Sequence, residues 1–272
     1  MKTFDKLTQN ILVTGGAGFI GSCLIRRLLN KTEFKIFNLD KISYASDLSS
    51  INNLISIDES LKTRYRLIKA DLNNYAAINN AIEISNPDII FHLAAESHVD
   101  RSIDSPRIFL ESNVNGTFNL LEATKNYWEN LSNEKRKIFR FHHISTDEVF
   151  GSLDDISRFS EDTKYSPRSP YSASKAASDH FVNAWHHTYN LPIIITNCSN
   201  NYGPWQFPEK LIPLTIQKCL KKEKIPVYGN GLNIRDWLFV EDHVDALLTC
   251  CTNGKLGSNY CIGGHGEKKN IE

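Results

Sequence analysis

The sequence lacks an excess of charge, a long apolar run and an export signal. Its 272 residues include 31 basic and 31 acidic side chains, so no overall field favours nucleic acid or an anionic membrane as a partner. No run approaches the roughly 18 apolar residues of a membrane span, and the N-terminal residues contain no apolar signal segment. These absences predict a cytoplasmic protein without nucleic-acid or membrane partners.

A metal-binding pattern is also missing. None of the spacings between cysteines is CxxC or typical of zinc sites, so the thiols are expected to be reduced and mostly structural. His142 and His143 are adjacent, but successive side chains of a strand point to opposite faces. We therefore predict no metal site. The six cysteines are at positions 23, 198, 219, 250, 251 and 261.

Short apolar runs alternate with helical patterns over residues 1–200. This alternation predicts a doubly wound parallel sheet, an α/β fold of the Rossmann type with helices on both faces. From residue 201, prolines and aromatics change the pattern, and residues 201–272 are expected to form a smaller substrate-binding region that is C-terminally truncated. The predicted strands are residues 11–13, 35–39, 66–70, 89–93, 139–144 and 193–196.

A glycine cluster follows the first of these strands and opens a helix. Gly15, Gly18 and Gly21 have the GxxGxxG spacing that lets backbone N–H groups approach a pyrophosphate. Asp40 comes 19 residues after Gly21, at the end of the second strand, where a carboxylate can accept from an adenosine ribose. Because that carboxylate would repel a 2′-phosphate, we expect NAD rather than NADP.

Two groups of residues predict the chemistry. Tyr171 and Lys175 are four residues apart and share one face of a helix. The ammonium is expected to lower the pKa of the phenol and to hold the nicotinamide ribose, which makes Tyr171 a base for alcohol oxidation. Thr146, Asp147 and Glu148 end the preceding strand and add a second acid–base pair, which hydride transfer alone does not need.

Several longer motifs resemble the dTDP-glucose 4,6-dehydratases, nucleotide-sugar enzymes of the extended short-chain dehydrogenase/reductase superfamily. The resemblance implies a homodimeric lyase that converts dTDP-glucose to dTDP-4-keto-6-deoxyglucose by C4 oxidation, water elimination and C6 reduction. The motifs are His92–Ser102, Ser145–Glu148, Tyr171–Lys175, Asn197–Pro204, Phe207–Pro213 and Arg235–Trp237.

The resemblance also implies individual roles. Tyr171 takes the O4 proton, Glu148 takes the C5 proton, Asp147 protonates the departing C6 hydroxyl, and Thr146 polarises the ketone. The cofactor site would comprise Gly15, Gly18, Phe19, Ile20, Gly21, Asp40, Lys41, Ser43, Asp71, Leu72, Leu93, Ala94, Ala95, Ser97, Ser112, Tyr171, Lys175 and Asn201. The substrate site would comprise Ser97, Thr146, Asn200, Lys210, Leu211, Ile212, Pro226, Tyr228, Arg235 and Asn270.

Three alternatives share much of this pattern. A UDP-glucose 4-epimerase-like enzyme has the same fold, cofactor and Tyr/Lys pair but needs no elimination acid or base. A GDP-mannose 4,6-dehydratase also eliminates water, but its pattern at the position of Thr146-Asp147-Glu148 is Thr-Ser-Glu. A truncated NAD-binding protein with little activity is the third alternative, although every catalytic position is intact.

Overall fold

The computed structural model describes residues 4–152, 158–227 and 230–271. Within these ranges, one sheet has seven strands, and each neighbouring pair is parallel. This sheet confirms the predicted α/β fold class. Across the sheet, the strands are β3 (Tyr65–Lys69), β2 (Lys35–Asp40), β1 (Asn10–Thr14), β4 (Ile89–His92), β5 (Arg140–Thr146), β6 (Ile193–Cys198) and β9 (Ser258–Ile262).

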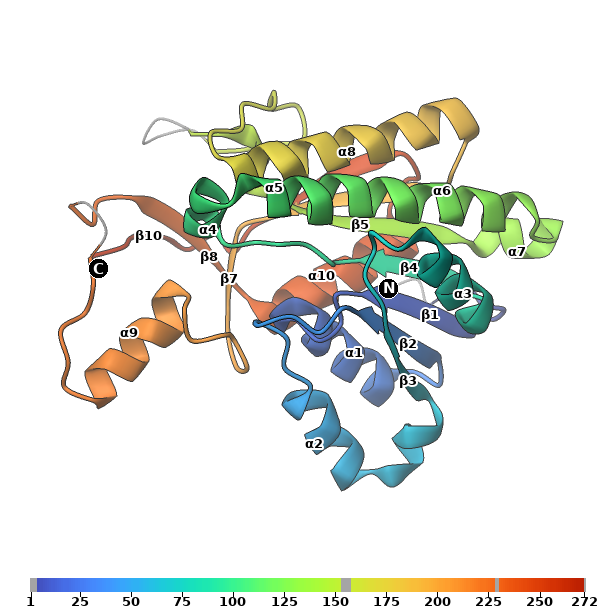
Figure 1. Cartoon of the computed structure of the whole chain (residues 1–272), viewed down its shortest axis with the longest axis horizontal. Coiled ribbons are helices and arrows are strands. Elements are labelled where there is room, and N and C mark those ends of the chain that lie inside the picture. The colour runs from blue at the N-terminus through green and yellow to red at the C-terminus, as the bar shows by residue number, and fades with distance from the viewer. Residues whose placement is uncertain (1–3, 153–157, 228–229, 272) are drawn as a thin grey trace.

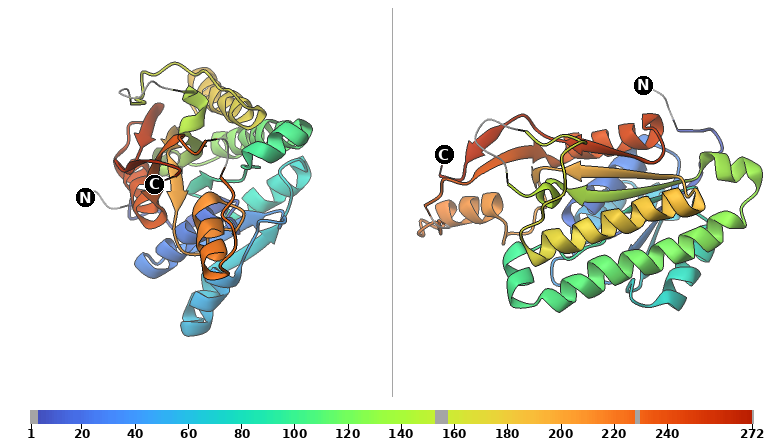
Figure 2. Two further views of the ribbon diagram at one scale, coloured as in Figure 1. Left: turned by 90° about the vertical axis from the view of Figure 1, so that its left-hand side faces the viewer. Right: turned by 90° about the horizontal axis from the view of Figure 1, so that it is seen from above.

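Helices cover both faces of this sheet (Figures 1 and 2). Side chains on β1 alternate between the two sides, so Leu12 packs in one apolar cluster and Val13 in the other. Burial on both faces explains why the strands are almost continuously apolar. One layer contains α1 (Phe19–Lys31), α2 (Ser49–Ile57) and α10 (Val240–Asn253), and the other contains α3 (Tyr75–Ser85), α6 (Gly116–Glu129) and α8 (Pro170–Tyr189).

Shorter helices connect these elements. The residues that join α5, η2 and α6 keep right-handed helical dihedrals, so the three run on as one rod above the sheet (Figure 1). Its middle, η2, is a π-helical turn, a feature that is frequent at functional sites. The short helices are η1 (Glu59–Thr63), α4 (Val99–Asp104), α5 (Pro106–Phe109), η2 (Leu110–Asn115), α7 (Asn133–Ile138) and η3 (Asp147–Phe150).

A second sheet lies beside the carboxyl ends of the main strands. Here β8 (Ile234–Phe239) pairs in parallel with β7 (Asn200–Tyr202) and antiparallel with β10 (Glu267–Lys269). The neighbouring helix α9 (Leu211–Leu220) has no buried residue (Figure 1, left). The division at residue 200 stays a prediction, and β9 and α10, which come after it, pack with the main sheet.

The order of the strands determines where a ligand can bind. From β1 the chain moves outward through β2 and β3, and it then returns to place β4 on the other side of β1. The connections therefore diverge between β1 and β4, and they leave a crevice at the carboxyl ends of these strands. The residues discussed below lie in and around this crevice.

Candidate active site

The turn between β1 and α1 is built for close approach of the backbone. Gly15 has a φ of +71°, and a Cβ there would lie 2.6 Å from the backbone nitrogen of Ala94. A Cβ on Gly21 would lie 2.3 Å from the carbonyl oxygen of Gly15. Gly18 caps α1 without a side-chain hydrogen bond, so no side chain covers the helix N-terminus at its cap. Such a terminus attracts an anion such as a pyrophosphate.

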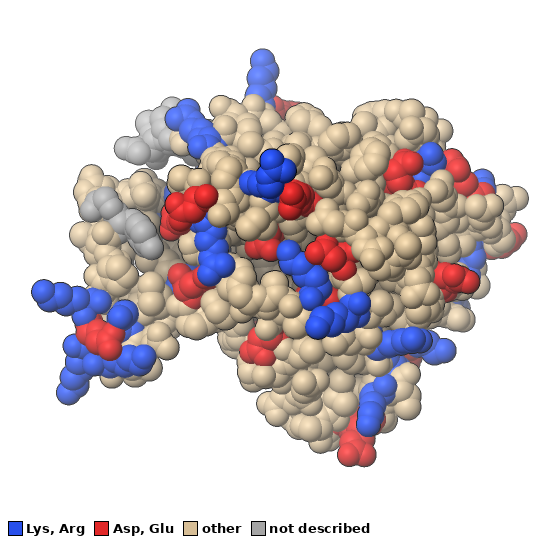
Figure 3. Space-filling model, in the orientation of Figure 1, with Lys and Arg blue, Asp and Glu red and all other residues tan. Residues whose placement is uncertain are grey.

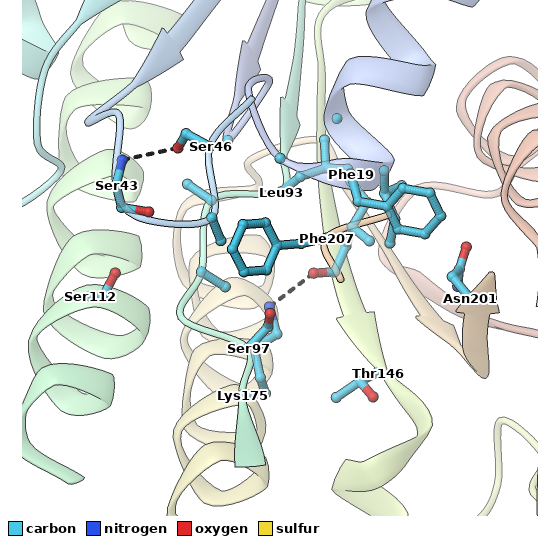
Figure 4. A pocket seen from close by; sticks show the side chains of 18 of the residues that line it. Phe19, Ser43, Ser46, Leu93, Ser97, Ser112, Thr146, Lys175, Asn201 and Phe207 are labelled. Atoms are coloured by element: carbon cyan, nitrogen blue, oxygen red, sulfur yellow. Dashed lines mark hydrogen bonds between the residues drawn. The ribbon is translucent and has the colours of Figure 1, made fainter. Parts of the chain in front are cut away.

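Asp40 fixes the rim of this turn. Its Oδ2 accepts from the amide of Ala17 at 3.0 Å, and its Oδ1 accepts from the amide of Ile42 at 2.8 Å and the hydroxyl of Ser46 at 3.1 Å. The carboxylate thereby joins the loop after β2 to the glycine turn. In the same loop, the amide of Ser43 donates to the Ser46 hydroxyl (Figure 4).

The residues predicted to bind the cofactor all line one cleft, together with the predicted catalytic residues. In the close view, Leu93 and Phe19 lie on the glycine-turn side, and Lys175 and Thr146 lie opposite (Figure 4). Lys, Arg, Asp and Glu side chains are interspersed around the hollow on this face of the molecule (Figure 3). The structure thus brings together distant parts of the chain, which are residues 15–21, 39–46, 70–72, 93–97, 112, 144–148, 171–175, 198–201 and 206–210.

The end of β5 supplies two carboxyl groups in a single turn. Thr146 caps η3, with its hydroxyl accepting from the amide of Glu148 at 3.3 Å and donating to Asp147 Oδ1 at 3.4 Å. Burial, and then the charge of Glu148, raises the pKa of Asp147 to about 7. Burial also raises the pKa of Glu148, while the charges of Arg235 and Lys210 oppose that rise. The adjacent carboxyls therefore have different electrostatic surroundings.

The Tyr171/Lys175 pair differs from the sequence expectation. Both side chains are buried on α8, and the Lys175 ammonium donates to the carbonyl of Ile144 at 2.9 Å. The pKa of Tyr171 is raised well above its usual value, first by burial and then by the charge of Glu148, while a hydrogen bond with Thr146 lowers it. In the protein alone the pKa of Tyr171 is therefore raised overall, and not lowered as the sequence predicts, because burial is the largest effect.

The predicted substrate residues divide into two sets. Ser97, Thr146, Asn200 and Lys210 line the cleft, and Lys210 Nζ donates to the carbonyl of Ser97 at 3.1 Å. Arg235, on β8, is exposed but acts electrostatically on Asp147 and Glu148. Five described residues that were predicted for the substrate site do not line the cleft: Leu211, Ile212, Pro226, Arg235 and Asn270. The sixth, Tyr228, lies outside the described residues.

A cluster at the mouth of the cleft was not predicted. The hydroxyl of Tyr44 donates to Glu209 at 3.1 Å, and the Arg101 guanidinium lies 3.7 Å from the centre of the Tyr44 ring. The ring of Phe207 packs edge-on against Tyr44, with 5.9 Å between centroids, and it lines the cleft (Figure 4). The only sequence signal for this cluster was indirect: Phe207 and Glu209 lie in the motif Phe207–Pro213, which resembles the family but assigns no role to either residue.

Among the described residues, no three His, Cys, Asp or Glu side chains are grouped to hold a metal ion. Nor does that part of the chain contain a helix that is long and apolar enough to cross a membrane. His142 and His143 are buried and hydrogen-bonded to Thr196 and Asp179, respectively, through their Nε2 atoms.

Comparison with known proteins identifies the family. The dTDP-glucose 4,6-dehydratase of Shigella flexneri is 54% identical over 273 residues, which cover 97% of this chain and 74% of that protein. The enzyme of the same name from Neisseria gonorrhoeae is 53% identical, with 97% and 75% covered. This chain belongs to the dTDP-glucose 4,6-dehydratase family. A family model described as GDP-mannose 4,6 dehydratase also matches residues 12–272.

Solved structures of the dTDP-glucose 4,6-dehydratase family have the same fold. The Bacillus anthracis enzyme, crystallised with NAD, is 42% identical with a TM-score of 0.84, and the match covers 97% of this chain and 78% of that one. The Streptomyces venezuelae enzyme, also with NAD bound, is 40% identical with a TM-score of 0.85, covering 96% and 77%. The predicted family and fold class are therefore confirmed.

Proposed function

We propose that this protein catalyses the NAD-dependent dehydration of dTDP-glucose to dTDP-4-keto-6-deoxyglucose. The observation that carries the proposal is the meeting of Tyr171 and Lys175 with Asp147 and Glu148 in one cleft. The first pair suits oxidation of a hydroxyl, and the second suits removal of a proton and a hydroxyl from neighbouring carbons. Relatives that carry this name at 52–54% identity support the same activity.

The cleft fits NAD. Gly15 and Gly21 leave no room for a Cβ, so the backbone of the turn can contact a pyrophosphate directly. Asp40 is held at the rim by hydrogen bonds from backbone amides, where it would meet the adenosine ribose and repel a 2′-phosphate. Lys175 would hold the nicotinamide ribose. Bound NAD would supply the redox chemistry of the reaction, which is the acceptance and the return of a hydride.

The protein's own residues perform the proton transfers. Tyr171 accepts the O4 proton, and Thr146 hydrogen-bonds the phenol so that its ionised form is favoured. A ketone at C4 makes the C5 proton acidic, and Glu148 removes it. Asp147, whose pKa of about 7 keeps a large protonated fraction at neutral pH, protonates the C6 hydroxyl, which leaves as water.

Two other members of the superfamily fit less well. An epimerase-like reaction leaves both Asp147 and Glu148 without a role. The description of the matching family model favours the GDP-mannose type. That type is expected to have Ser at the position of Asp147, however, and the individual relatives favour dTDP-glucose. We therefore assign dTDP-glucose as the substrate.

The test is incubation of the purified protein and NAD with dTDP-glucose, UDP-glucose and GDP-mannose, one at a time. We expect the alkaline absorbance of a 4-keto sugar with dTDP-glucose, at a rate at least about tenfold above the other two sugars. Release of a 4-epimer without loss of water, or preference for another sugar, would overturn the assignment.

The proposal includes a homodimer in the cytoplasm. Leu110 and Phe118, which are 53% and 40% exposed, supply apolar area on the η2–α6 rod, and Tyr189 lies at the end of the neighbouring helix α8. All six cysteines are free, in keeping with a reducing compartment. Light scattering should give twice the chain mass, and Phe118→Glu should give the monomer. A monomeric parent protein would contradict the proposal.

A further inference from the structure

A buried carboxylate lies one helical turn beyond Lys175. Asp179 lies on α8 and is fully buried. Four side chains donate hydrogen bonds to its carboxylate: His143 at 3.0 Å, Ser145 at 2.8 Å, Tyr165 at 2.9 Å and Asn197 at 3.3 Å. The proposed proton transfers do not use Asp179. Burying an ionised group is costly unless charge and hydrogen bonds compensate it, so this arrangement requires an explanation.

The hydrogen bonds connect Asp179 to the strand that carries the acid and base. Its oxygens accept from His143 and Ser145, which flank Ile144 on β5. The Lys175 ammonium donates to the carbonyl of Ile144 itself. Asp179 and Lys175 thus hold three successive residues of β5 from one face of α8. Thr146, the cap of the catalytic turn, is the second residue after Ile144.

Among the described basic side chains that surround Asp179, Lys175 is the one that is positively charged at neutral pH. Burial lowers the pKa of His143 to about 4, so this imidazole is neutral at pH 7. His92 also has a strongly lowered pKa because it is fully buried, and burial raises the pKa of Tyr165 and keeps its phenol neutral. Burial lowers the pKa of Lys175, and the charge of Asp179 is the largest effect that opposes this. Cys198 faces Lys175 as a thiol, since burial raises its pKa to about 12.

We propose that Asp179 is a positioning residue that keeps Lys175 protonated and holds it against β5 beside Tyr171. It acts through Lys175 and does not contact the reacting atoms. This inference rests on the proposed function, in which the Lys175 ammonium must be charged to stabilise the ionised phenol and to hold the ribose. The i, i+4 spacing of the two residues on α8 puts their opposite charges on one helix face.

The first experiment compares Asp179→Asn with Tyr165→Phe. Each variant disturbs a hydrogen bond at Asp179, but only the first removes the negative charge. Without that charge the pKa of Lys175 falls, so the alkaline limb of the C4 oxidation step, followed as NADH formation in a single turnover and independent of Asp147, should move at least about one unit toward lower pH in Asp179→Asn, a tenfold loss of rate at pH values above the limb. Tyr165→Phe should keep the parent's limb.

A second measurement does not depend on activity. In cofactor-free Asp179→Asn, the lower pKa of Lys175 in the folded state widens the pH range in which folding releases its proton, compared with a protein that keeps the charge of Asp179. The free energy of unfolding rises with pH wherever the unfolded state binds more protons than the folded state. Its melting temperature should therefore rise between about pH 7 and pH 9, relative to Tyr165→Phe. The double variant Lys175→Met, Asp179→Asn should lose this pH dependence, because the titrating ammonium is gone.

The outcomes separate the two proposals. If the parent protein does not dehydrate dTDP-glucose, the proposed function fails, and the thermal measurement still tests the pairing of charges. If the parent is active but Asp179→Asn keeps its alkaline limb, or matches Tyr165→Phe in both measurements, then Asp179 is a structural hydrogen-bond acceptor only, and the inference is overturned.

Discussion

The two sides of the cleft are built in different ways. On the cofactor side, position depends on backbone geometry: Gly15 has a positive φ, and the turn that it forms is packed against Ala94. On the substrate side, position depends on long charged side chains, such as Lys210 and the exposed Arg235, near a helix without any buried residue. A closely packed turn suits a cofactor that is regenerated in every cycle, whereas long charged side chains suit a substrate that must enter and leave.

The turn after β5 lies between these two sides. Its cap, Thr146, ends a buried strand of the main sheet, but the carboxyls of Asp147 and Glu148 are influenced by the cations of the substrate side. The comparison therefore predicts three grades of effect. Changes on the cofactor side should remove binding and stability together, changes in the turn should remove chemistry, and changes on the substrate side should weaken substrate affinity.

The largest effect is expected for Gly15→Ala. The new Cβ meets the backbone of Ala94 at 2.6 Å in a left-handed conformation, so we expect the free energy of unfolding to fall by about 3 kcal/mol. NAD binding, measured by calorimetry, should be lost. Gly18→Ala is the matched control, because φ there is −78° and the nearest atom to a Cβ is at 3.2 Å. Equal loss of stability in the two variants would contradict this description of the turn.

The next effect concerns the two carboxyls. Asp147→Asn and Glu148→Gln should each slow formation of the 4-keto-6-deoxy product by about 10²–10⁴-fold, the range for loss of an acid or base. Deuterium exchange at C5 distinguishes them: Glu148→Gln should lose the exchange, and Asp147→Asn should keep it. If Asp147→Asn abolishes the exchange and Glu148→Gln does not, the two roles are reversed.

The pH dependence sharpens the assignment of the acid. With a pKa of about 7, Asp147 loses its proton as the pH rises through neutrality, and kcat should fall about tenfold per unit above that point. Because folding raises this pKa, the binding of a proton to Asp147 adds to the free energy of unfolding. This contribution is fully present below about pH 4 and is lost as the pH rises to about 7. Melting curves of Asp147→Asn should lack this loss. A profile of kcat that is flat from pH 6 to 9 would exclude Asp147 as the acid.

The smallest effect is expected for Arg235→Lys. The charge remains, but two parallel hydrogen bonds to a diphosphate are no longer possible, so KM for dTDP-glucose should rise about tenfold with kcat nearly unchanged. Lys218→Gln, which removes a half-buried cation on α9 that pairs with Glu223, serves as the control and should leave both constants unchanged. A fall in kcat with constant KM would place Arg235 with the catalytic turn instead.

The grouping of the segments on the cofactor side could be predicted from the sequence because local rules determine it. Glycine spacing, strand periodicity and an acidic residue at the end of the second strand depend only on neighbours in the chain, and the corresponding segments line one cleft. Strands β1 to β6 were all anticipated as apolar runs. The short SNYCI segment of β9 was not, because its residues are only partly buried and its pattern is weak.

The rest depends on contacts between segments that are distant in sequence. Nothing near Tyr171 in the chain shows that burial and Glu148 raise its pKa. The contact between Tyr44 and Glu209 spans 165 residues, and Asp179 meets Tyr165, Asn197 and His143 only after α8 packs on the sheet. Electrostatic effects of this kind follow from the three-dimensional arrangement, so a motif can indicate the participants but not their protonation.

One short turn, η3, has a consequence for the diversification of this fold. Thr146 and the two carboxyls occupy successive positions at the edge of the sheet, and neither the glycine turn nor α8 donates a hydrogen bond to the side chain of Asp147 or Glu148 in the described structure. An exchange of Asp147 and Glu148 can therefore alter the outcome of the reaction, while Thr146, which hydrogen-bonds the phenol of Tyr171, is kept for the redox chemistry. For protein engineering, positions 147 and 148 are therefore the ones to vary in directing one scaffold toward elimination or toward simple oxidation and reduction, because Val149 and Phe150, which follow, are buried.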